Sequence, residues 1–370
     1  MGMKDYFHMV SGDGELSYSQ NSSVQKQAWL LNQHILETAI QSLISSEESG
    51  KTEGLHVVDL GCGVGPVPLA LVSLVVDVMQ RKCKELNRDK IPKLVMYMND
   101  LPSNDFNLLF KDLMKLEALK GRDNYGVPSC FVMGAPGSYY DRLFPNNTLH
   151  FVHANYTLHW LSQVPPGIHD EQGIPLNKGN IYLSETCPKE VAKAYFTQFE
   201  QDLTHFIKLR SEEMVHNGCM LMTLRGRPCP TDSLTWTSFE LKLITEALTC
   251  LVSEGLIKEE KVDSFNMPCY HASTEQLESI VKKEGSFEVE DSKTSIFDVV
   301  PEIEDTWEKA QVITKFIRAF SESILSSHFG KNIMSPLYDK LLDQVFKFLD
   351  HGHPAQNHAV TVLLRKKHAY

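Results

Sequence analysis

Residues 55–66 read LHVVDLGCGVGP, and this stretch decides the fold. A short apolar run leads through Asp59 into three glycines at alternate positions, 61, 63 and 65. The run is typical of a buried strand, and glycines directly after it let the backbone adopt positive φ and approach a ligand closely. Residues 69–86 then carry apolar side chains at helical spacing. The stretch therefore predicts a strand, a ligand-binding turn and a helix.

The rest of the chain repeats this alternation. Further strands are predicted at 93–98, 128–133, 148–154, 218–225 and 358–367, and helices at 24–44, 106–119, 191–216, 234–254 and 334–349. Strands that alternate with helices predict a parallel sheet covered on both faces. We therefore expect an α/β fold with a Rossmann-like core over residues 1–225 plus 286–370. Residues 226–285 are expected to form a helical cap over it.

Composition narrows the class of protein. The 370 residues include 36 Lys plus Arg against 47 Asp plus Glu, a net charge of −11, which argues against a duplex-DNA partner. The sequence contains no apolar stretch long enough to span a membrane and no secretory leader pattern. The eight cysteines include no CxxC pair, which fits a reducing compartment. We expect a cytoplasmic protein whose partner is a small molecule, with neither nucleic acid nor membrane as a partner.

The acidic residues around the glycines indicate which ligand the turn binds. A dinucleotide-binding turn has the pattern GxGxxG with an acid about 20 residues further on. Here Asp100 comes 39 residues after the first glycine and Asp59 precedes it. Asp59 would repel a pyrophosphate but can accept hydrogen bonds from an ammonium group, and Asp100 can accept two from a ribose. S-adenosylmethionine has both groups and no phosphate. Alternatively, Asp59 only caps the next helix and the glycines only turn the chain.

Seven segments in order resemble one family, the plant SABATH methyltransferases, which include salicylate and benzoate carboxyl methyltransferases and the theobromine and caffeine synthases. The resemblance covers nearly the whole chain. The segments are SYSQNSSVQKQ (17–27), DLGCGVGP (59–66), NDLPSNDFNLLF (99–110), GAPGSYYDRLFP (134–145), LHWLSQVP (158–165), NKGNIY (177–182) and VDSFNMPCY (262–270).

The resemblance implies a set of residues around the methyl donor S-adenosylmethionine: Tyr18, Asp59, Cys62, Asp100, Leu101, Ser138 and Tyr139. Tyr139 would flank the adenine, where the family usually has Phe. Val10 and Val67 stand where the family usually has Lys and Asn, which help to hold the donor. A typical hydrogen bond contributes only about 0.5 to 1.5 kcal/mol net, so function is expected to persist. A degenerate, non-catalytic metabolite-binding member is the further alternative.

The resemblance also implies a metal site and an assembly. Asn177, Asp263, Phe265 and Asn266 match positions at which some family members hold a structural Mg²⁺, in part through backbone oxygens. The family often forms homodimers, so a homodimer is expected.

Four residues match the family's pocket for the methyl acceptor: Gln25, Tyr156, His159 and Trp160. A carboxylate acceptor is already ionised at neutral pH and requires no general base, but it needs donors that orient it. The amide of Gln25 and the indole N–H of Trp160 are suitable donors. From the residues alone, Gln25 could equally be a solvated helix residue and Trp160 a core residue.

The acceptor could also be a ring nitrogen. Its proton would have to leave, and His159 could in principle take it. His159 occurs in both branches of the family and decides nothing. Gln25 is typical of the carboxyl methyltransferases, whereas Arg225 is typical of the caffeine and theobromine synthases, where it is linked to xanthine recognition. We expect methyl ester formation on a small cyclic or aromatic acid, with N-methylation of a methylxanthine as the alternative.

Overall fold

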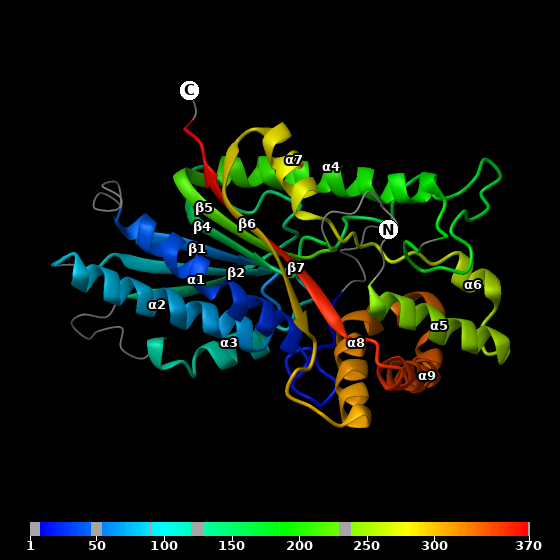
Figure 1. Cartoon of the computed structure of the whole chain (residues 1–370). Helices are drawn as coiled ribbons and strands as arrows, with labels where there is room; N and C mark the ends of the chain where they lie inside the picture. The colour runs from blue at the N-terminus through cyan, green and yellow to red at the C-terminus, as the bar shows by residue number, and fades with distance from the viewer. Residues whose placement is uncertain are drawn as a thin grey trace.

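A computed structural model of the protein describes residues 8–45, 54–88, 91–119, 129–184, 186–228 and 238–368. Its centre is a seven-stranded sheet of order β3-β2-β1-β4-β5-β7-β6 (Figure 1). The strands are β1 (Gly54–Leu60), β2 (Lys93–Asp100), β3 (Cys130–Pro136), β4 (Leu149–Asn155), β5 (Met214–Arg225), β6 (Phe287–Asp298) and β7 (Gln356–Lys366). The first five are parallel, and β7 is antiparallel to both β5 and β6. The prediction of an α/β fold with a largely parallel sheet is confirmed.

Helices cover both faces of this sheet (Figure 1). On one face lie α1 (Ser23–Ser45), α2 (Pro66–Glu85), α3 (Phe106–Leu113) and the short turn Glu117–Leu119, and on the other lie α4 (Lys189–Glu213) and α7 (Thr274–Glu284). Because neighbouring side chains on a strand point to opposite faces, Val57 packs into the core with α1 and α2, while Val58 packs into the core with α4. The buried, apolar strand predicted at 55–60 therefore separates two hydrophobic cores.

A group of helices lies beyond the carboxyl ends of the parallel strands, at the lower right of Figure 1. It consists of α5 (Phe239–Ser253), α6 (Glu259–Asp263), α8 (Thr306–Phe329) and α9 (Lys331–Asp350). Helix α9 packs against both α8 and α5. Of these helices only α5 and α6 fall within residues 226–285, the range predicted for the cap, and α8 and α9 come from the range 286–370 assigned to the core. The division into 1–225 plus 286–370 and 226–285 stays a prediction, and the four helices together are called the cap below.

Some element boundaries differ from those predicted. The helix predicted at 191–216 ends at Glu213, and β5 begins at Met214, four residues before the predicted start at 218. Asn217 takes the left-handed conformation with φ 59°, and the pairing of β5 with β4 shifts register nearby. Asn217 and Gly218, residue types that favour turns, therefore form an irregularity inside a longer strand. The first residues of the helix predicted at 234–254 lie outside the described residues.

Strand β6 and helix α8 were not predicted. Strand β6 lies at the edge of the sheet, and most of its side chains are exposed or half-buried. Its sequence, FEVEDSKTSIFD, is rich in charged and polar residues, which is typical of an edge strand. Such a sequence lacks the alternation of apolar and polar residues by which a half-buried strand is predicted.

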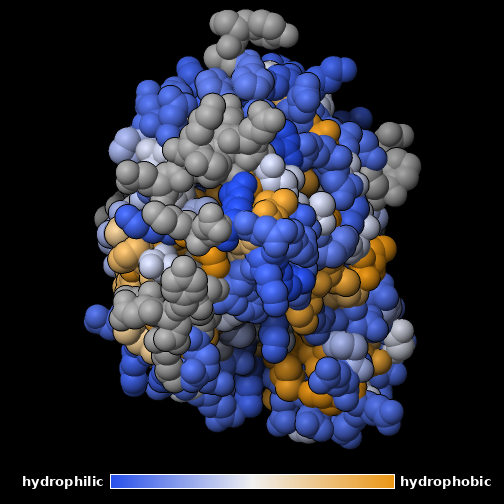
Figure 2. Space-filling model, turned by 90° about the vertical axis from the view of Figure 1, so that its left-hand side faces the viewer, coloured by the Kyte–Doolittle hydropathy of each residue, from blue (hydrophilic) through white to orange (hydrophobic). Residues whose placement is uncertain are grey.

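Hydrophilic side chains predominate on the face shown in Figure 2, and hydrophobic ones gather in separate patches. Among the described residues, no helix is both long and apolar enough to cross a bilayer.

The topology places a ligand site at one end of the sheet. From β1 the chain passes to β2 and β3 on one side and then returns to β4 on the other. In open α/β sheets ligands bind at the carboxyl ends of the strands where the order reverses in this way. The ends of β1, β2 and β4 meet at this point, beneath the cap.

Candidate active site

The turn after β1 depends on its glycines. Gly61 and Gly63 have φ of 66° and 60°, which favours glycine. A Cβ on Gly61 would lie 2.2 Å from the Thr157 methyl carbon, so a larger residue would force that segment away. The predicted tight turn agrees with this geometry, whereas the close approach of a ligand to the glycine backbone stays a prediction.

Asp100, the last residue of β2, is bound to the same turn. Its Oδ2 accepts a hydrogen bond from the Gly63 N–H at 2.7 Å, and its Oδ1 accepts one from the Leu101 N–H at 2.7 Å. Burial raises the pKa of Asp100 to about 6, although these two hydrogen bonds act to lower it. The carboxylate is therefore ionised at neutral pH but close to its titration range.

Asp59 and His153 form a buried pair on neighbouring strands. The two residues lie opposite each other in the β1–β4 register, and His153 Nδ1 donates to Asp59 Oδ1 at 2.7 Å. Both side chains are about 3% exposed. Asp59 Oδ2 is buried and has no hydrogen-bond partner within the described part of the chain. A buried carboxylate oxygen without a partner is costly, so this atom points to a bound donor group.

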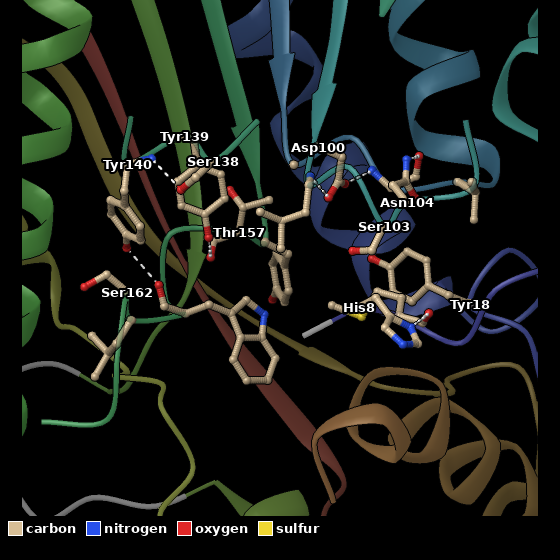
Figure 3. A pocket seen from close by; sticks show the side chains of 18 of the residues that line it. His8, Tyr18, Asp100, Ser103, Asn104, Ser138, Tyr139, Tyr140, Thr157 and Ser162 are labelled. Atoms are coloured by element: carbon tan, nitrogen blue, oxygen red, sulfur yellow. Dashed lines mark hydrogen bonds between the residues drawn. The ribbon is translucent and has the colours of Figure 1, made fainter. Parts of the chain in front are cut away.

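A cavity of about 360 Å³ opens between the ends of the strands (Figure 3). On one side lie Ser138, Tyr139 and Tyr140, and across from them lie Asp100 and Tyr18. Leu101 lines the cavity as well. All the predicted donor residues except Asp59 and Cys62 therefore line this cavity.

Asp59 and Cys62 line a small adjoining cavity, together with Tyr18 and Gln25. Tyr18 belongs to the walls of both. Burial raises the pKa values of the Tyr18 hydroxyl and the Cys62 thiol, so both groups are neutral at pH 7. Among the described residues of this wall, Asp59 thus supplies a buried carboxylate oxygen that has no hydrogen-bond partner.

The described residues fit S-adenosylmethionine in chemical type. Asp59 offers a partnerless carboxylate oxygen for an ammonium, Asp100 a second carboxylate for a ribose, and Tyr139 an aromatic ring for a purine. The two departures from the family pattern lie here as well: Val10 lines the larger cavity and Val67 the adjoining one. Their apolar side chains offer the donor no hydrogen bond.

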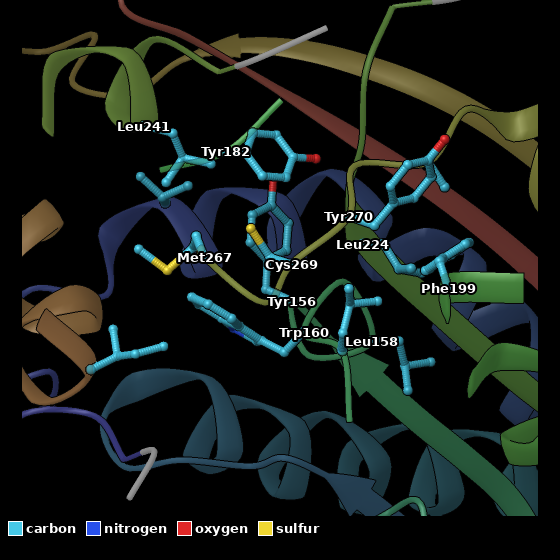
Figure 4. Packing of buried hydrophobic residues seen from close by; sticks show 14 of the residues in the cluster. Tyr156, Leu158, Trp160, Tyr182, Phe199, Leu224, Leu241, Met267, Cys269 and Tyr270 are labelled. Atoms are coloured by element: carbon cyan, nitrogen blue, oxygen red, sulfur yellow. The ribbon is translucent and has the colours of Figure 1, made fainter. Parts of the chain in front are cut away.

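The five predicted acceptor residues come together around a second cavity: Gln25, Tyr156, His159, Trp160 and Arg225. Tyr156, Trp160 and Cys269 belong to the cluster of buried hydrophobic residues shown in Figure 4. This acceptor cavity shares Met9, Tyr18, Tyr156 and Trp160 with the donor cavity. Its volume is about 40 Å³, whereas a cavity that takes benzene measures roughly 150 Å³. A ring-shaped acceptor must therefore push the lining side chains apart.

His159 is neutral in this cavity. Burial and the positive charge of Arg225 lower its pKa to about 3, and its Nδ1 has no partner among the residues described. Tyr156, next to it, holds a left-handed backbone with φ 58°, and its hydroxyl donates to Asn357 Oδ1 at 2.6 Å. A left-handed backbone is rare for a bulky residue and often marks a functional site.

Several lining residues escaped the sequence analysis: Met9, Ser238, Glu240, Leu241, Cys269, His271, Phe316 and Phe320. Glu240 is the most informative of them because it is 1% exposed and ion-paired with Arg225. It stands one to three turns before Ile244, Ala247 and Leu251 on the buried face of α5. A carboxylate on the apolar face of a predicted helix was the signal that could have found it.

A buried ion pair holds the segment that carries Tyr139. Arg210 Nε lies 2.9 Å from Glu213 Oε2, with both side chains 0% exposed. Arg210 also donates to the backbone oxygen of Tyr139 at 3.0 Å, and Glu213 Oε1 accepts from the Leu143 and Phe144 N–H groups at 2.7 and 3.0 Å. Helix α4 therefore fixes the backbone that places the tyrosine against the donor cavity.

The four predicted metal ligands lie near one another but form no carboxylate cluster. Asn177 Nδ2 donates to Asn266 Oδ1 at 3.2 Å, and Asp263 accepts from the Gly179 N–H at 2.7 Å. Asn177 Oδ1 is buried without a partner in the described chain. Phe265, which lies between Asp263 and Asn266 in the sequence, is buried as well. Oxygen donors suit Mg²⁺, although among the four only Asp263 is a carboxylate. A structural Mg²⁺ here stays a prediction.

Comparisons with known proteins point to one family. A family model described as SAM dependent carboxyl methyltransferase matches residues 4–367. The chain is 43% identical to a 3,7-dimethylxanthine N-methyltransferase of Camellia sinensis var. assamica, over 98% of this chain and 96% of that protein. It is 41% identical to caffeine synthase 1 of Camellia taliensis, with the same coverage.

A solved structure is similar over nearly the full length. It is a loganic acid methyltransferase with SAH, the demethylated form of the donor, and it has a TM-score of 0.85, 33% identity and coverage of 98% of this chain and 99% of that one. The relatives thus include proteins named for methylating a ring nitrogen and one named for methylating an acid. By fold, by the matched family model and by full-length relatives, the chain belongs to the SAM-dependent carboxyl methyltransferase family, the SABATH methyltransferases.

Proposed function

We propose that the protein transfers a methyl group from S-adenosylmethionine to the carboxylate of a small cyclic or aromatic acid, forming a methyl ester. The observation that carries this proposal is the burial of His159 beside Arg225 in the acceptor cavity, which lowers the pKa of His159 to about 3 and leaves a neutral, weak base there. An acceptor that is already ionised needs no base, and a carboxylate is ionised at neutral pH.

The donor residues would hold the methyl donor across two cavities. Asp100 would accept hydrogen bonds from the ribose hydroxyls, Asp59 Oδ2 would accept from the ammonium, and Tyr139 would pack against the adenine. His153 would keep the Asp59 carboxylate turned toward its ligand through the 2.7 Å hydrogen bond. When bound, S-adenosylmethionine supplies a methyl group on a positively charged sulfur.

The acceptor residues would align the nucleophile with that methyl group. Displacement at a methyl carbon requires the attacking oxygen, the carbon and the leaving sulfur to lie in line. Tyr18, Tyr156 and Trp160 line both cavities, so they stand where the methyl group would pass. Gln25 lines the acceptor cavity and the cavity of Asp59, which suits an amide that orients a carboxylate beside the sulfur.

A second candidate, N-methylation of a methylxanthine-like ring, has support of its own. The relatives at 41 to 43% identity are named as a dimethylxanthine N-methyltransferase and a caffeine synthase. Arg225, typical of that branch, lines the acceptor cavity. This reaction would have to release a ring proton, and His159 at a pKa of about 3 is a poor group to take it.

The acceptor class can be tested with purified protein and labelled donor. We offer benzoate, salicylate, nicotinate, cyclic keto acids and methylxanthines, and we expect turnover of acids. Gln25→Ala should reduce kcat/KM for the acids by about 10- to 100-fold, because the carboxylate loses a hydrogen bond that orients it. Gln33→Ala, on the same helix but outside the cavity, is the matched control. Turnover of methylxanthines with none of acids would reject the proposal.

Donor binding should also depend on pH. Asp100 has a pKa of about 6, raised from the ordinary value by burial, and only its ionised form accepts from both ribose hydroxyls. Protonation on going from pH 7.5 to pH 5.5 is therefore expected to weaken SAH binding, with uptake of about one proton by the free protein. Calorimetry of SAH binding across this range measures the effect. An affinity that stays constant down to pH 5 would contradict the assigned role of Asp100.

A further inference from the structure

The wall of the acceptor cavity contains a buried ion pair. Arg225 is the last residue of β5, and Glu240 lies in the first turn of α5. Arg225 Nη2 lies 2.5 Å from Glu240 Oε2, and the two side chains are 8% and 1% exposed. Both line the cavity with His159 and Trp160. The charge of Arg225 is therefore balanced inside the pocket and is not left over for an anionic ligand.

This ion pair uses only part of its hydrogen-bonding capacity. Glu240 Oε1 and Arg225 Nε are both buried, and neither has a partner among the described residues. Leaving a buried charged group partly unsatisfied costs more than leaving a neutral one, and most buried polar atoms in proteins are paired. Glu240 Oε1 and Arg225 Nε are therefore an acceptor and a donor without partners among the described residues, in the wall of a cavity that must widen to admit a ring.

We propose that Glu240 is a specificity-determining residue for the methyl acceptor. Its Oε1 accepts a hydrogen bond from a hydroxyl or ring N–H of the acceptor, while Arg225 Nε donates to an adjacent oxygen of the same molecule. The acceptor is then a ring acid with a second, uncharged polar group that can donate a hydrogen bond. This inference rests on the proposed function only in naming the methylated group as a carboxylate.

The pairing also predicts which acceptors are rejected. A second carboxylate at this end of the acceptor would face Glu240, and like charges in a buried site repel strongly. An unsubstituted ring would leave both polar atoms without partners, and sites built to hydrogen-bond a ligand reject analogues that lack the group. Hydroxy-substituted acids should therefore bind better than unsubstituted acids and better than dicarboxylates.

The test uses the full-length protein saturated with SAH and compares matched ligands by calorimetry. The probes are benzoate and its three monohydroxy isomers, with theobromine, which keeps one ring N–H, and caffeine, which has none. In the wild-type protein the best hydroxybenzoate should bind about 10- to 100-fold more tightly than benzoate. The double variant Arg225→Met/Glu240→Leu removes both charges and keeps the pocket neutral, and such replacements are often tolerated. It should lose this preference while still binding benzoate.

Two further variants sharpen the result. Glu240→Gln leaves the charge of Arg225 unbalanced, so isophthalate, a dicarboxylate, should bind more tightly than it does to the wild type. Glu246→Gln, on the same helix but outside the cavity, should change neither the preference for the hydroxybenzoate over benzoate nor the affinity for isophthalate. The inference is overturned if the wild-type protein binds the hydroxybenzoates no more tightly than benzoate and theobromine no more tightly than caffeine. It is also overturned if the double variant keeps the wild-type preference.

Binding ratios and turnover separate this inference from the proposed function. If acids are not methylated but theobromine binds more tightly than caffeine, and the double variant abolishes that difference, the carboxylate assignment fails and Glu240 keeps its role. If acids are methylated with no preference among the matched pairs, the proposed function stands and the role of Glu240 is rejected.

Discussion

Replacing Asp100 by alanine is expected to weaken binding of S-adenosylmethionine and SAH by about 10²- to 10⁴-fold. Two hydrogen bonds from ribose hydroxyls to a carboxylate are worth roughly 1.5 to 3 kcal/mol each, and each 1.4 kcal/mol is tenfold in affinity. The substitution also removes the acceptor of the Gly63 N–H, which holds the glycine turn against β2. Calorimetry of SAH binding measures the loss directly.

The matched control is Asp112→Asn. Asp112 lies on α3 and pairs with Lys115 at the surface, so its charge can be removed without touching the donor cavity. It should leave SAH affinity unchanged. A loss below about fivefold for Asp100→Ala would mean that the carboxylate does not hold the ribose.

The second large effect is on stability. Replacing Arg210 by methionine is expected to lower the free energy of unfolding by about 3 to 5 kcal/mol, because it removes the fully buried partner of a buried carboxylate. Among the described residues, Glu213 then keeps only the partly exposed Arg142, 3.3 Å away, as an ion-pair partner. The side chains of Arg210 and Glu213 are fully buried, and they hold the backbone of the segment that carries Tyr139. SAH affinity should fall in the same variant, since that segment forms one wall of the donor cavity.

Urea denaturation followed by circular dichroism gives the free energy of unfolding. Arg81→Met is the control, because Arg81 pairs with Glu37 at the surface with 56% of its side chain exposed. Exposed pairs of this kind contribute about 0 to 1 kcal/mol. Similar losses for the two variants would show that the Arg210–Glu213 pair does not support the fold as the structure indicates.

The sequence predicted most of what lies along single elements. The apolar run and the glycines at 55–66 predicted the strand, the turn and the ligand site, and every predicted acceptor residue lines one cavity. Contacts between elements that are far apart in the sequence could not be predicted from it. His153 meets Asp59 only because β4 pairs with β1 in one register, and one sequence without that register gives no reason to join them.

Glu240 shows the same limit for the cap. Its place on the apolar face of α5 was visible in the sequence, but its partner Arg225 comes from β5 across the cavity. Strand β6 was hidden by its polar edge composition. The expected homodimer, cytoplasmic location and bound Mg²⁺ concern assembly, cell context and an ion, and they stay predictions.

The fate of the transferred methyl group tests the central claim most directly. The protein is incubated with methyl-labelled donor and the best acceptor from the panel, and the product is treated with mild alkali. A methyl ester hydrolyses and releases the label as methanol, whereas a methyl group on a ring nitrogen stays attached. We predict that nearly all of the label is released. Label that stays with the product would contradict carboxyl methylation.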